Sequence, residues 1–466
     1  MTVEDDLMQV DAIVARARVA QAKFEASGSQ ALYDRAAKAA AWAIMEPTRN
    51  RTLAELAVKT TGLGNVADKI IKNHRKTLGL MRDLETARTF GVVSDDAETG
   101  ITEIARPKGV IGAVVPSTNP AATPANNIIN ALKCGNAIVL SPSPKGVPSC
   151  ETLISYIYAE FDKFGLDHDL VQMVPAPGSK EKTQRLLEIT DTIVVTGSQN
   201  NVKRAYTSGT PALAVGAGNV TVIVDETADL KAAAKKITAS KTFDNATSCS
   251  SENSIVVVDA VFDDFMKALS DAGGAYIQDD GPIIAKLWPN GHLNPAIMAQ
   301  DADKMLAAFG MSDLPSNTEF LAVETTGIGP DYPLSGEKLS RVAALYRASD
   351  FAEAVIITAK IQAHLGAGHS VGLHSMQDSR AMSLAQAIPT SRVIVNQAHC
   401  FATGGAFNNG MPFSLSMGCG SWGGNSIDDN VHWKHFMQTT KIVREIPARE
   451  PEVSDIFAEY WDAAGA

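Results

Sequence analysis

The sequence predicts an α/β protein with two units built around parallel sheets. Short apolar runs alternate with helix-length segments from residue 110 onward, as in Val110–Pro116 followed by Ala125–Leu132. Buried parallel strands read as continuous apolar runs because helices cover both faces of their sheet. The 466-residue chain is also long enough for two or three domains with a large core. Sheets of this class bind nucleotides at the carboxyl ends of their strands.

The chain opens with helices. Four stretches carry apolar residues at helical spacing, at 7–17, 32–40, 53–58 and 66–84. We assign no chemistry to them. The polar segment Gly91–Arg106 follows with alternating side chains, and it predicts an exposed hairpin that is a candidate oligomerisation arm.

Strands and helices then alternate in two blocks. The first block has expected strands at Val110–Pro116, Ala137–Leu140, Leu170–Val174, Thr192–Val195, Ala212–Val215 and Val220–Val224. The second block has expected strands at Ile255–Val258, Phe320–Val323, Ala343–Tyr346 and Val393–Asn396. We therefore expect a cofactor domain over residues 1–225 and a second α/β domain over residues 226–430. Residues 431–466 should form an oligomerisation tail, of which Lys434–Ile446 pairs with a partner subunit.

Charge and composition exclude several classes of protein. The formal net charge of −11 argues against a nucleic-acid partner, which needs clustered Lys and Arg. The acidic start, Met1–Asp6, does not resemble a signal peptide, and the chain lacks the run of about 18 apolar residues that a membrane span needs. Five cysteines without CxxC spacing argue against a disulfide framework or a metal site: Cys134, Cys150, Cys249, Cys400 and Cys419. A cytoplasmic location is expected.

The segment Ser240–Ser254 is the most informative for chemistry. It joins an expected helix at 229–239 to the strand at Ile255, and its Ser and Thr content predicts a loop at the edge of a sheet. Cys249 would then lie outside the core, where a thiol can act as a nucleophile. The alternative is a small buried hydrophobic residue, because a reactive thiol needs surroundings that lower its pKa.

Two further stretches favour a catalytic role. Asn119 follows an expected strand in a polar turn, where its amide can donate to a developing oxyanion, although an ordinary turn Asn before Pro would look the same. Gly418–Ser426 places four glycines around Trp422, which indicates close backbone approach or positive φ.

Seven segments together resemble the CoA-acylating branch of the aldehyde dehydrogenase superfamily, over residues 10–445. They are Thr118-Asn119-Pro120, Ser141-Pro142-Ser143-Pro144, Thr196-Gly197, Val215-Gly216-Ala217-Gly218-Asn219, Phe243-Asp244-Asn245 with Cys249, Glu337-Lys338-Leu339-Ser340, and Gly418–Ser426. The resemblance implies an aldehyde dehydrogenase-like fold, with a Rossmann-type NAD(P)-binding domain over 1–225 and a catalytic domain over 226–430. It also implies a homodimer or homotetramer.

The resemblance implies a role for each matching residue. Cys249 would attack the aldehyde, while the Asn119 amide and the Cys249 backbone N–H hold the oxyanion. A thioester on Cys249 would form as hydride passes to NAD or NADP, and coenzyme A would then take the acyl group. The cofactor would be bound by Ser141, Pro142, Ser143, Thr196, Gly197, Gly216, Gly218 and Glu337. Glu337 would hold the nicotinamide ribose, or else be a solvated carboxylate at a helix start. The sequence leaves open NAD against NADP, the physiological direction and the residues that bind CoA.

One departure from the wider family favours acyl transfer over hydrolysis. Hydrolytic aldehyde dehydrogenases carry a general-base glutamate in the motif Glu-Leu-Gly-Gly-Lys, whereas the matching stretch here, Val215–Asn219, has no carboxylate. Without that base, attack by water should be slow, and the acyl-enzyme can wait for CoA. Two alternatives remain, a hydrolytic enzyme with another base and a non-catalytic homologue.

Departures within the branch bear on the substrate. Ser143 stands where relatives often have His, Ala246 where they usually have Gly, and Ser248 where they have a bulkier apolar residue. Candidate pocket residues are Thr123, Ser248, Ser250, His369 and His399, with Asn126, Asn127 and Thr403 nearby. Such a polar pocket suits an anionic aldehyde. Sulfoacetaldehyde is favoured over succinate semialdehyde, with acetaldehyde and propionaldehyde next.

Overall fold

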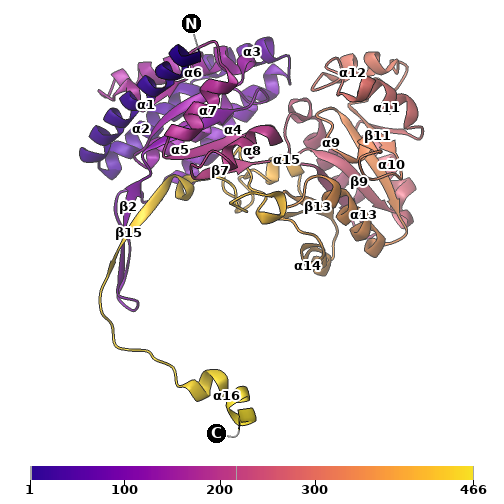
Figure 1. The fold of residues 1–466 in the computed structure, drawn as a ribbon. Coiled ribbons are helices and arrows are strands. Elements are labelled where there is room, and N and C mark those ends of the chain that lie inside the picture. Colours follow the sequence, from indigo (N-terminus) through magenta and orange to yellow (C-terminus); the bar gives the residue numbers. More distant parts are fainter. Residues whose placement is uncertain (1–2, 217, 465–466) are drawn as a thin grey trace.

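The computed structural model describes residues 3–216 and 218–464. The predicted α/β fold is confirmed: two units with parallel sheets lie side by side, and an arm projects from the first (Figure 1). Four helices open the first unit, α1 (Val3–Ala26), α2 (Gln30–Met45), α3 (Pro47–Thr61) and α4 (Val66–Leu84). Side-chain caps define three of these starts. Ser29 accepts from the Leu32 N–H, Glu46 accepts from the Thr48 and Arg49 N–H groups, and Asn65 accepts from the Asp68 N–H.

The first unit holds a five-stranded parallel sheet in the order β5-β4-β3-β6-β7 within the described residues. Its strands are β3 (Val110–Val115), β4 (Ala137–Pro142), β5 (Val171–Met173), β6 (Thr192–Thr196) and β7 (Ala212–Val215). Its helices are α5 (Ala122–Lys133), α6 (Val147–Asp162), α7 (Lys180–Ile189) and α8 (Gln199–Tyr206). The chain moves outward from β3 in one direction and then returns to β6 on the other side. The crevice between the carboxyl ends of β3 and β6 is therefore a topological switch point, where such sheets bind ligands.

The second unit holds a seven-stranded sheet in the order β10-β11-β12-β9-β8-β13-β14 within the described residues. Its strands are β8 (Val220–Val224), β9 (Glu252–Val258), β10 (Gly274–Ile277), β11 (Phe320–Glu324), β12 (Val342–Ala348), β13 (Val371–His374) and β14 (Val393–Val395). Its helices are α9 (Leu230–Thr242), α10 (Phe262–Asp271), α11 (Gly281–Leu287), α12 (Ala302–Phe309), α13 (Phe351–His364), α14 (Asp378–Ala387) and α15 (His399–Ala402). Alternate residues of β9 enter two different cores, because successive side chains of a strand point to opposite faces.

The boundaries between the units differ from the sequence expectation in two places. The strand Val220–Val224, expected in the first domain, pairs with β9 and β13 in the second sheet. Phe413, Val431 and Phe436 belong to the core of the first unit, so the chain returns there after residue 404. A periodicity of strands and helices identifies each element but does not say which sheet it joins, because pairing is a long-range property.

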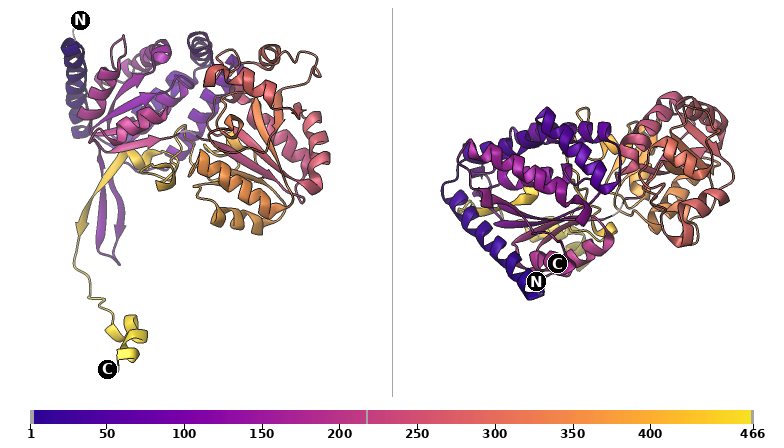
Figure 2. Two further views of the ribbon diagram at one scale, coloured as in Figure 1. Left: turned by 45° about the vertical axis from the view of Figure 1, so that its right-hand side comes forward. Right: turned by 90° about the horizontal axis from the view of Figure 1, so that it is seen from above.

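The arm is a three-stranded antiparallel sheet that extends away from the body (Figure 2). It confirms the hairpin, with β1 (Gly91–Asp96) and β2 (Ile101–Pro107). The third strand, β15 (Met437–Val443), pairs with β2 of the same chain, whereas the sequence expectation paired this segment with a partner. The helix α16 (Val453–Ala464) follows at the end of an extended stretch. Among the described helices, none combines the length and apolar character needed to span a bilayer.

Candidate active site

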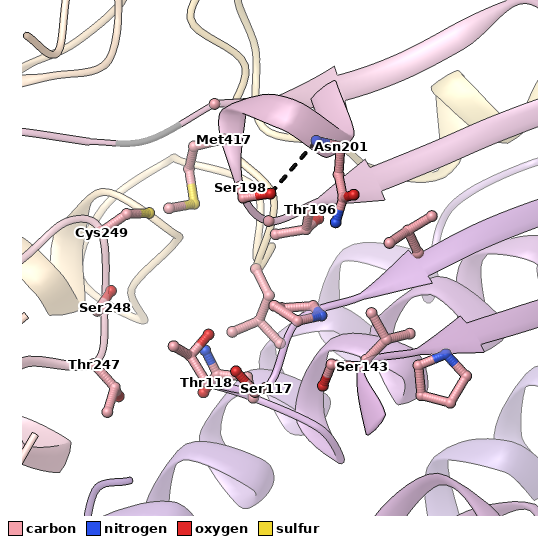
Figure 3. A pocket seen from close by; sticks show the side chains of 18 of the residues that line it. Ser117, Thr118, Ser143, Thr196, Ser198, Asn201, Thr247, Ser248, Cys249 and Met417 are labelled. Carbon is pink, nitrogen blue, oxygen red and sulfur yellow. Dashed lines mark hydrogen bonds between the residues drawn. The ribbon is translucent and has the colours of Figure 1, made fainter. Parts of the chain in front are cut away.

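A cavity of about 760 Å³ lies where the two units meet. Its wall combines the carboxyl ends of β3, β4 and β6, the cysteine loop before β9, and the α4 face of the first unit. Figure 3 shows the Cys249 side chain extending from one side, while Ser117, Thr118 and Ser143 lie across from it at the strand ends. The volume lies in the range of small-molecule and cofactor sites.

The cysteine loop begins with an unusual backbone. Asp244, Asn245 and Ala246 have positive φ values of 48°, 54° and 59°. The left-handed region disfavours residues with a Cβ by roughly 1 kcal/mol or more each. Ala246 carries this cost in place of the glycine that the family resemblance led us to expect. Surrounding contacts hold the loop, since Arg341 donates twice to Asn245 Oδ1 and Asn245 Nδ2 donates to Asp301 and to a backbone carbonyl.

A buried ionic network joins this loop to α4. Asp244 is fully buried and accepts from Lys69 Nζ at 3.0 Å and also from Lys72 Nζ. Lys72 in turn donates to Asn119 Oδ1 at 2.9 Å and to Thr247 Oγ1 at 3.2 Å. Because Lys72 occupies the Asn119 oxygen, the Asn119 amide nitrogen is the group left to donate into the cavity.

The Cys249 thiol is protonated in this arrangement. Burial raises its pKa to about 12, and the Glu337 carboxylate adds to the effect. The thiol nevertheless lines the cavity and is the partly exposed member of the five cysteines, the others being buried. Deprotonation must therefore accompany attack on a bound electrophile.

The alkylation rate of Cys249 tests this state directly. We expect the rate with iodoacetamide to rise about tenfold per pH unit from about pH 6 to pH 9, because the thiolate fraction grows in that proportion below the pKa. Peptide mass spectrometry measures the modification at Cys249. Glutathione is the reference, because its alkylation rate levels off near the pKa of its own thiol. A plateau below about pH 8 would contradict a raised pKa.

Two helix N-termini lie at the cavity wall. The side chain of Ser179 caps α7 and that of Ser198 caps α8, and both serines line the cavity. Partial positive charge at helix N-termini favours phosphate groups. Ser143 also lines the cavity, and its buried Oγ has no hydrogen-bond partner among the described residues. These features fit a phosphate-bearing cofactor.

Glu337 also lines the cavity. It lies in a loop after a short 3-10 helix, partly buried, and is not a solvated carboxylate at a helix start. Burial raises the pKa of Glu337 to about 7, and the fully buried Lys241 on α9 interacts with it electrostatically. Burial disfavours the charged form of Lys241 too, and lowers its pKa to about 7.

The structure brings most of the expected site residues together around the cavity. These are Cys249, Asn119, Ser141, Pro142, Ser143, Thr196, Gly197, Gly216, Glu337, Ser248 and Ser250. Ala217 lies outside the described residues.

Four expected residues are not part of the cavity wall. Thr123 is buried within α5. His369 and His399 are buried and share the hydroxyl of Ser370, and burial lowers the pKa of His369 to about 3. The other ring nitrogen of His369, Nε2, has no hydrogen-bond partner among the described residues. Gly218 lies against the Cys249 backbone, where any side chain would collide with the Cys249 carbonyl oxygen. Its role is close backbone approach, which a glycine pattern alone does not distinguish from cofactor contact.

Sequence reasoning missed five cations that line the cavity, of which Lys180 and Arg204 belong to α7 and α8. Lys72, Arg75 and Lys76 on α4 line the cavity, although we assigned the opening helices no chemistry. The signal was available, since Lys69, Lys72 and Lys76 recur at helical spacing on the face of α4 that also carries Leu80. Charged residues on the buried face of a helix are rare unless they are paired or functional.

The chain is similar to known proteins in both sequence and structure. The sequence model of the aldehyde dehydrogenase family matches residues 3–309. An acylating sulfoacetaldehyde dehydrogenase from Cupriavidus necator is 56% identical over 98% of this chain and 93% of its own. The structure of an acetylating aldehyde dehydrogenase from Geobacillus thermoglucosidasius matches with a TM-score of 0.91 at 30% identity, covering 97% of this chain and 99% of that one.

A Rhodopseudomonas palustris propionaldehyde dehydrogenase, solved with bound propionyl-CoA, matches with a TM-score of 0.83 at 25% identity, covering 93% of this chain and 94% of that one. The likeness thus extends over both units, and these relatives include acylating enzymes. The chain belongs to the aldehyde dehydrogenase family, among its CoA-acylating members.

Proposed function

We propose that this enzyme oxidises a short anionic aldehyde, sulfoacetaldehyde in the first instance, to its acyl-CoA with NAD or NADP. The observation that carries the proposal is the placement of the Cys249 thiol and the Asn119 amide in one cavity. The similarity to the acylating sulfoacetaldehyde dehydrogenase supports the substrate class. We propose Cys249 as the nucleophile and Asn119 as an oxyanion donor.

The protein's own groups account for the first chemical step. The Cys249 sulfur bonds to the aldehyde carbon while the C=O π bond opens and its electron pair moves to the oxygen, and the thiol proton is released to solvent. The Asn119 amide nitrogen donates to that oxygen, in the orientation that Lys72 sets by donating to Asn119 Oδ1. The Asp244 carboxylate holds Lys72 and thereby the amide.

Two helix starts and two side chains would hold the dinucleotide. The capped starts of α7 and α8 suit its phosphates, and Ser143 offers an unpartnered hydroxyl. Glu337 would hold the nicotinamide ribose. A bound nicotinamide would accept hydride from the carbon attached to Cys249, which leaves a thioester on the enzyme.

The surroundings of the thioester favour a thiol acceptor over water. The Val215–Asn219 stretch has no carboxylate, and Asn219 is engaged structurally through its amide, which donates to Ser335 O at 2.8 Å and Leu365 O at 3.1 Å. Among the described lining residues, Glu337 is the one carboxylate, and the cofactor ribose would occupy it. CoA therefore completes the turnover.

The dependence of the rate on CoA tests the proposal. With sulfoacetaldehyde and either nucleotide, steady-state NAD(P)H formation should fall at least about 100-fold when CoA is omitted, because a general base contributes about that factor to attack by water. Sulfoacetyl-CoA should be the product by mass spectrometry. Equal rates without CoA, with release of sulfoacetate, would show that another group activates water and would refute the acylating assignment.

We propose that the arm mediates a homodimer or homotetramer. Its outer strands β1 and β15 have exposed edges, and apolar side chains of Val92, Ile442 and Val443 are exposed there. Unpaired strand edges of this kind pair readily with another chain.

A further inference from the structure

The α4 wall of the cavity carries two cations that backbone carbonyls and the aromatic rings of Phe401 and Phe413 hold in place. Arg75 donates to the carbonyl oxygens of Phe401 at 2.8 Å and Gly405 at 2.9 Å. Lys76 Nζ donates to Gly404 O and, at 3.0 Å, to Ser414 O. These contacts fix both side chains but do not neutralise them.

The neighbouring charges leave this wall positive. Lys69 and Lys72 share the carboxylate of Asp244, so two ammonium groups meet one buried anion. The strongest electrostatic influences on Lys76 come from Arg75, Lys72, Cys400 and Cys249. Burial lowers the pKa of Lys76 to about 7, and Arg75 adds to the shift. A buried cation of this kind is stabilised by an anion that enters the cavity.

Lys76 and Cys249 line the same cavity. Lys72, one helical turn before Lys76 on the buried face of α4, donates to Thr247, which lies two residues before Cys249. A two-carbon aldehyde with an anionic group at its far end needs a cation in the same cavity as the nucleophilic thiol. A sulfonate offers three acceptor oxygens, and the ammonium and guanidinium groups each keep N–H donors beyond those used on the backbone.

We infer, on the basis of the proposed function, that Arg75 and Lys76 bind the sulfonate of the substrate and orient its aldehyde carbon toward Cys249. They are specificity residues, separate from the Asp244 network that positions Asn119. Neutral aldehydes gain nothing from them. Their loss should therefore change the preference among aldehydes and leave the chemistry at Cys249 intact.

The test compares Lys76→Met and Arg75→Gln with the wild-type enzyme on sulfoacetaldehyde and acetaldehyde. Each variant should raise the KM for sulfoacetaldehyde by about 10- to 100-fold, the usual effect of one charge-assisted contact. The kcat/KM for acetaldehyde should stay within about threefold, which also shows that the variants fold. Arg82→Gln is the matched control, because Arg82 is on α4, does not line the cavity and should change neither value.

A second measurement needs no turnover. Isethionate, a stable sulfonate, should protect Cys249 of the wild-type enzyme from iodoacetamide and should fail to protect the Lys76→Met variant. Unchanged KM values together with retained protection would overturn the inference while the proposed function stands. A raised KM for CoA in place of the aldehyde would also overturn it, by assigning the cations to a cofactor phosphate. Preference of the wild-type enzyme for acetaldehyde, without protection by isethionate, would refute both the anionic substrate and the site.

Discussion

Replacing Cys249 with alanine should abolish aldehyde oxidation, with kcat lowered at least about 10⁴-fold. The thiol is the nucleophile to which the substrate is bound throughout the oxidation, so no residual covalent pathway remains. The fold should survive, since the side chain is small and partly exposed to the cavity. Steady-state NAD(P)H formation with CoA present measures the loss.

A second cysteine in the same cavity supplies the control. Cys400 also lines the wall, and burial raises the pKa of its thiol to about 12. The Cys400→Ala variant should keep activity within a few-fold. Incubation of wild-type enzyme with sulfoacetyl-CoA should add the acyl mass to the peptide that contains Cys249, and this adduct should be missing from Cys249→Ala. Full activity in Cys249→Ala would remove the mechanism and favour a different chemistry altogether.

The substitution Asp244→Asn should have the largest effect on stability. It is nearly isosteric, but it leaves the buried ammonium groups of Lys69 and Lys72 without their shared anion. Breaking a buried ion pair by removing one partner costs about 3–5 kcal/mol. Urea unfolding at neutral pH should show this loss in the free energy of unfolding, and kcat should fall as well because Lys72 no longer holds Asn119.

The matched control for this prediction is Lys69→Met. It removes one of the two ammonium groups and leaves Asp244 paired with Lys72, so its cost should be much smaller than that of Asp244→Asn. The two lysines hold the pKa of Asp244 below its ordinary value despite burial. The ion pairs therefore contribute stability above the unfolded-state pKa of Asp, and this contribution is lost as pH falls through the folded-state pKa. The Asp244→Asn variant should lack this acid-dependent part. Equal losses in both variants would contradict the shared-anion account.

The sequence by itself determined the fold class, the branch of the family and eleven of the residues that line the cavity. Apolar runs alternating with helical stretches are local patterns, so they identified strands such as Val110–Val115 without knowledge of their partners. The motifs around Asn119 and Cys249 are likewise contiguous, and the lack of a carboxylate in Val215–Asn219 is legible in the residues alone. Chemistry that rests on short segments could therefore be predicted.

Only the tertiary structure decided what depends on contacts between distant segments. Val220–Val224 pairs in the second sheet, and His369 and His399 are buried in the interior. Residues of α4 line the cavity. The local sequence around a histidine or a lysine does not show whether its side chain lines a cavity or lies in a core. Burial depends on packing between segments that are more than 100 residues apart in the sequence. The pairing of Lys72 with Asp244, 172 positions away, is of this kind. The sequence identifies the candidate reacting residues, Cys249 and Asn119. The packing of α4 against the cysteine loop determines their orientation and the charge of the surrounding pocket.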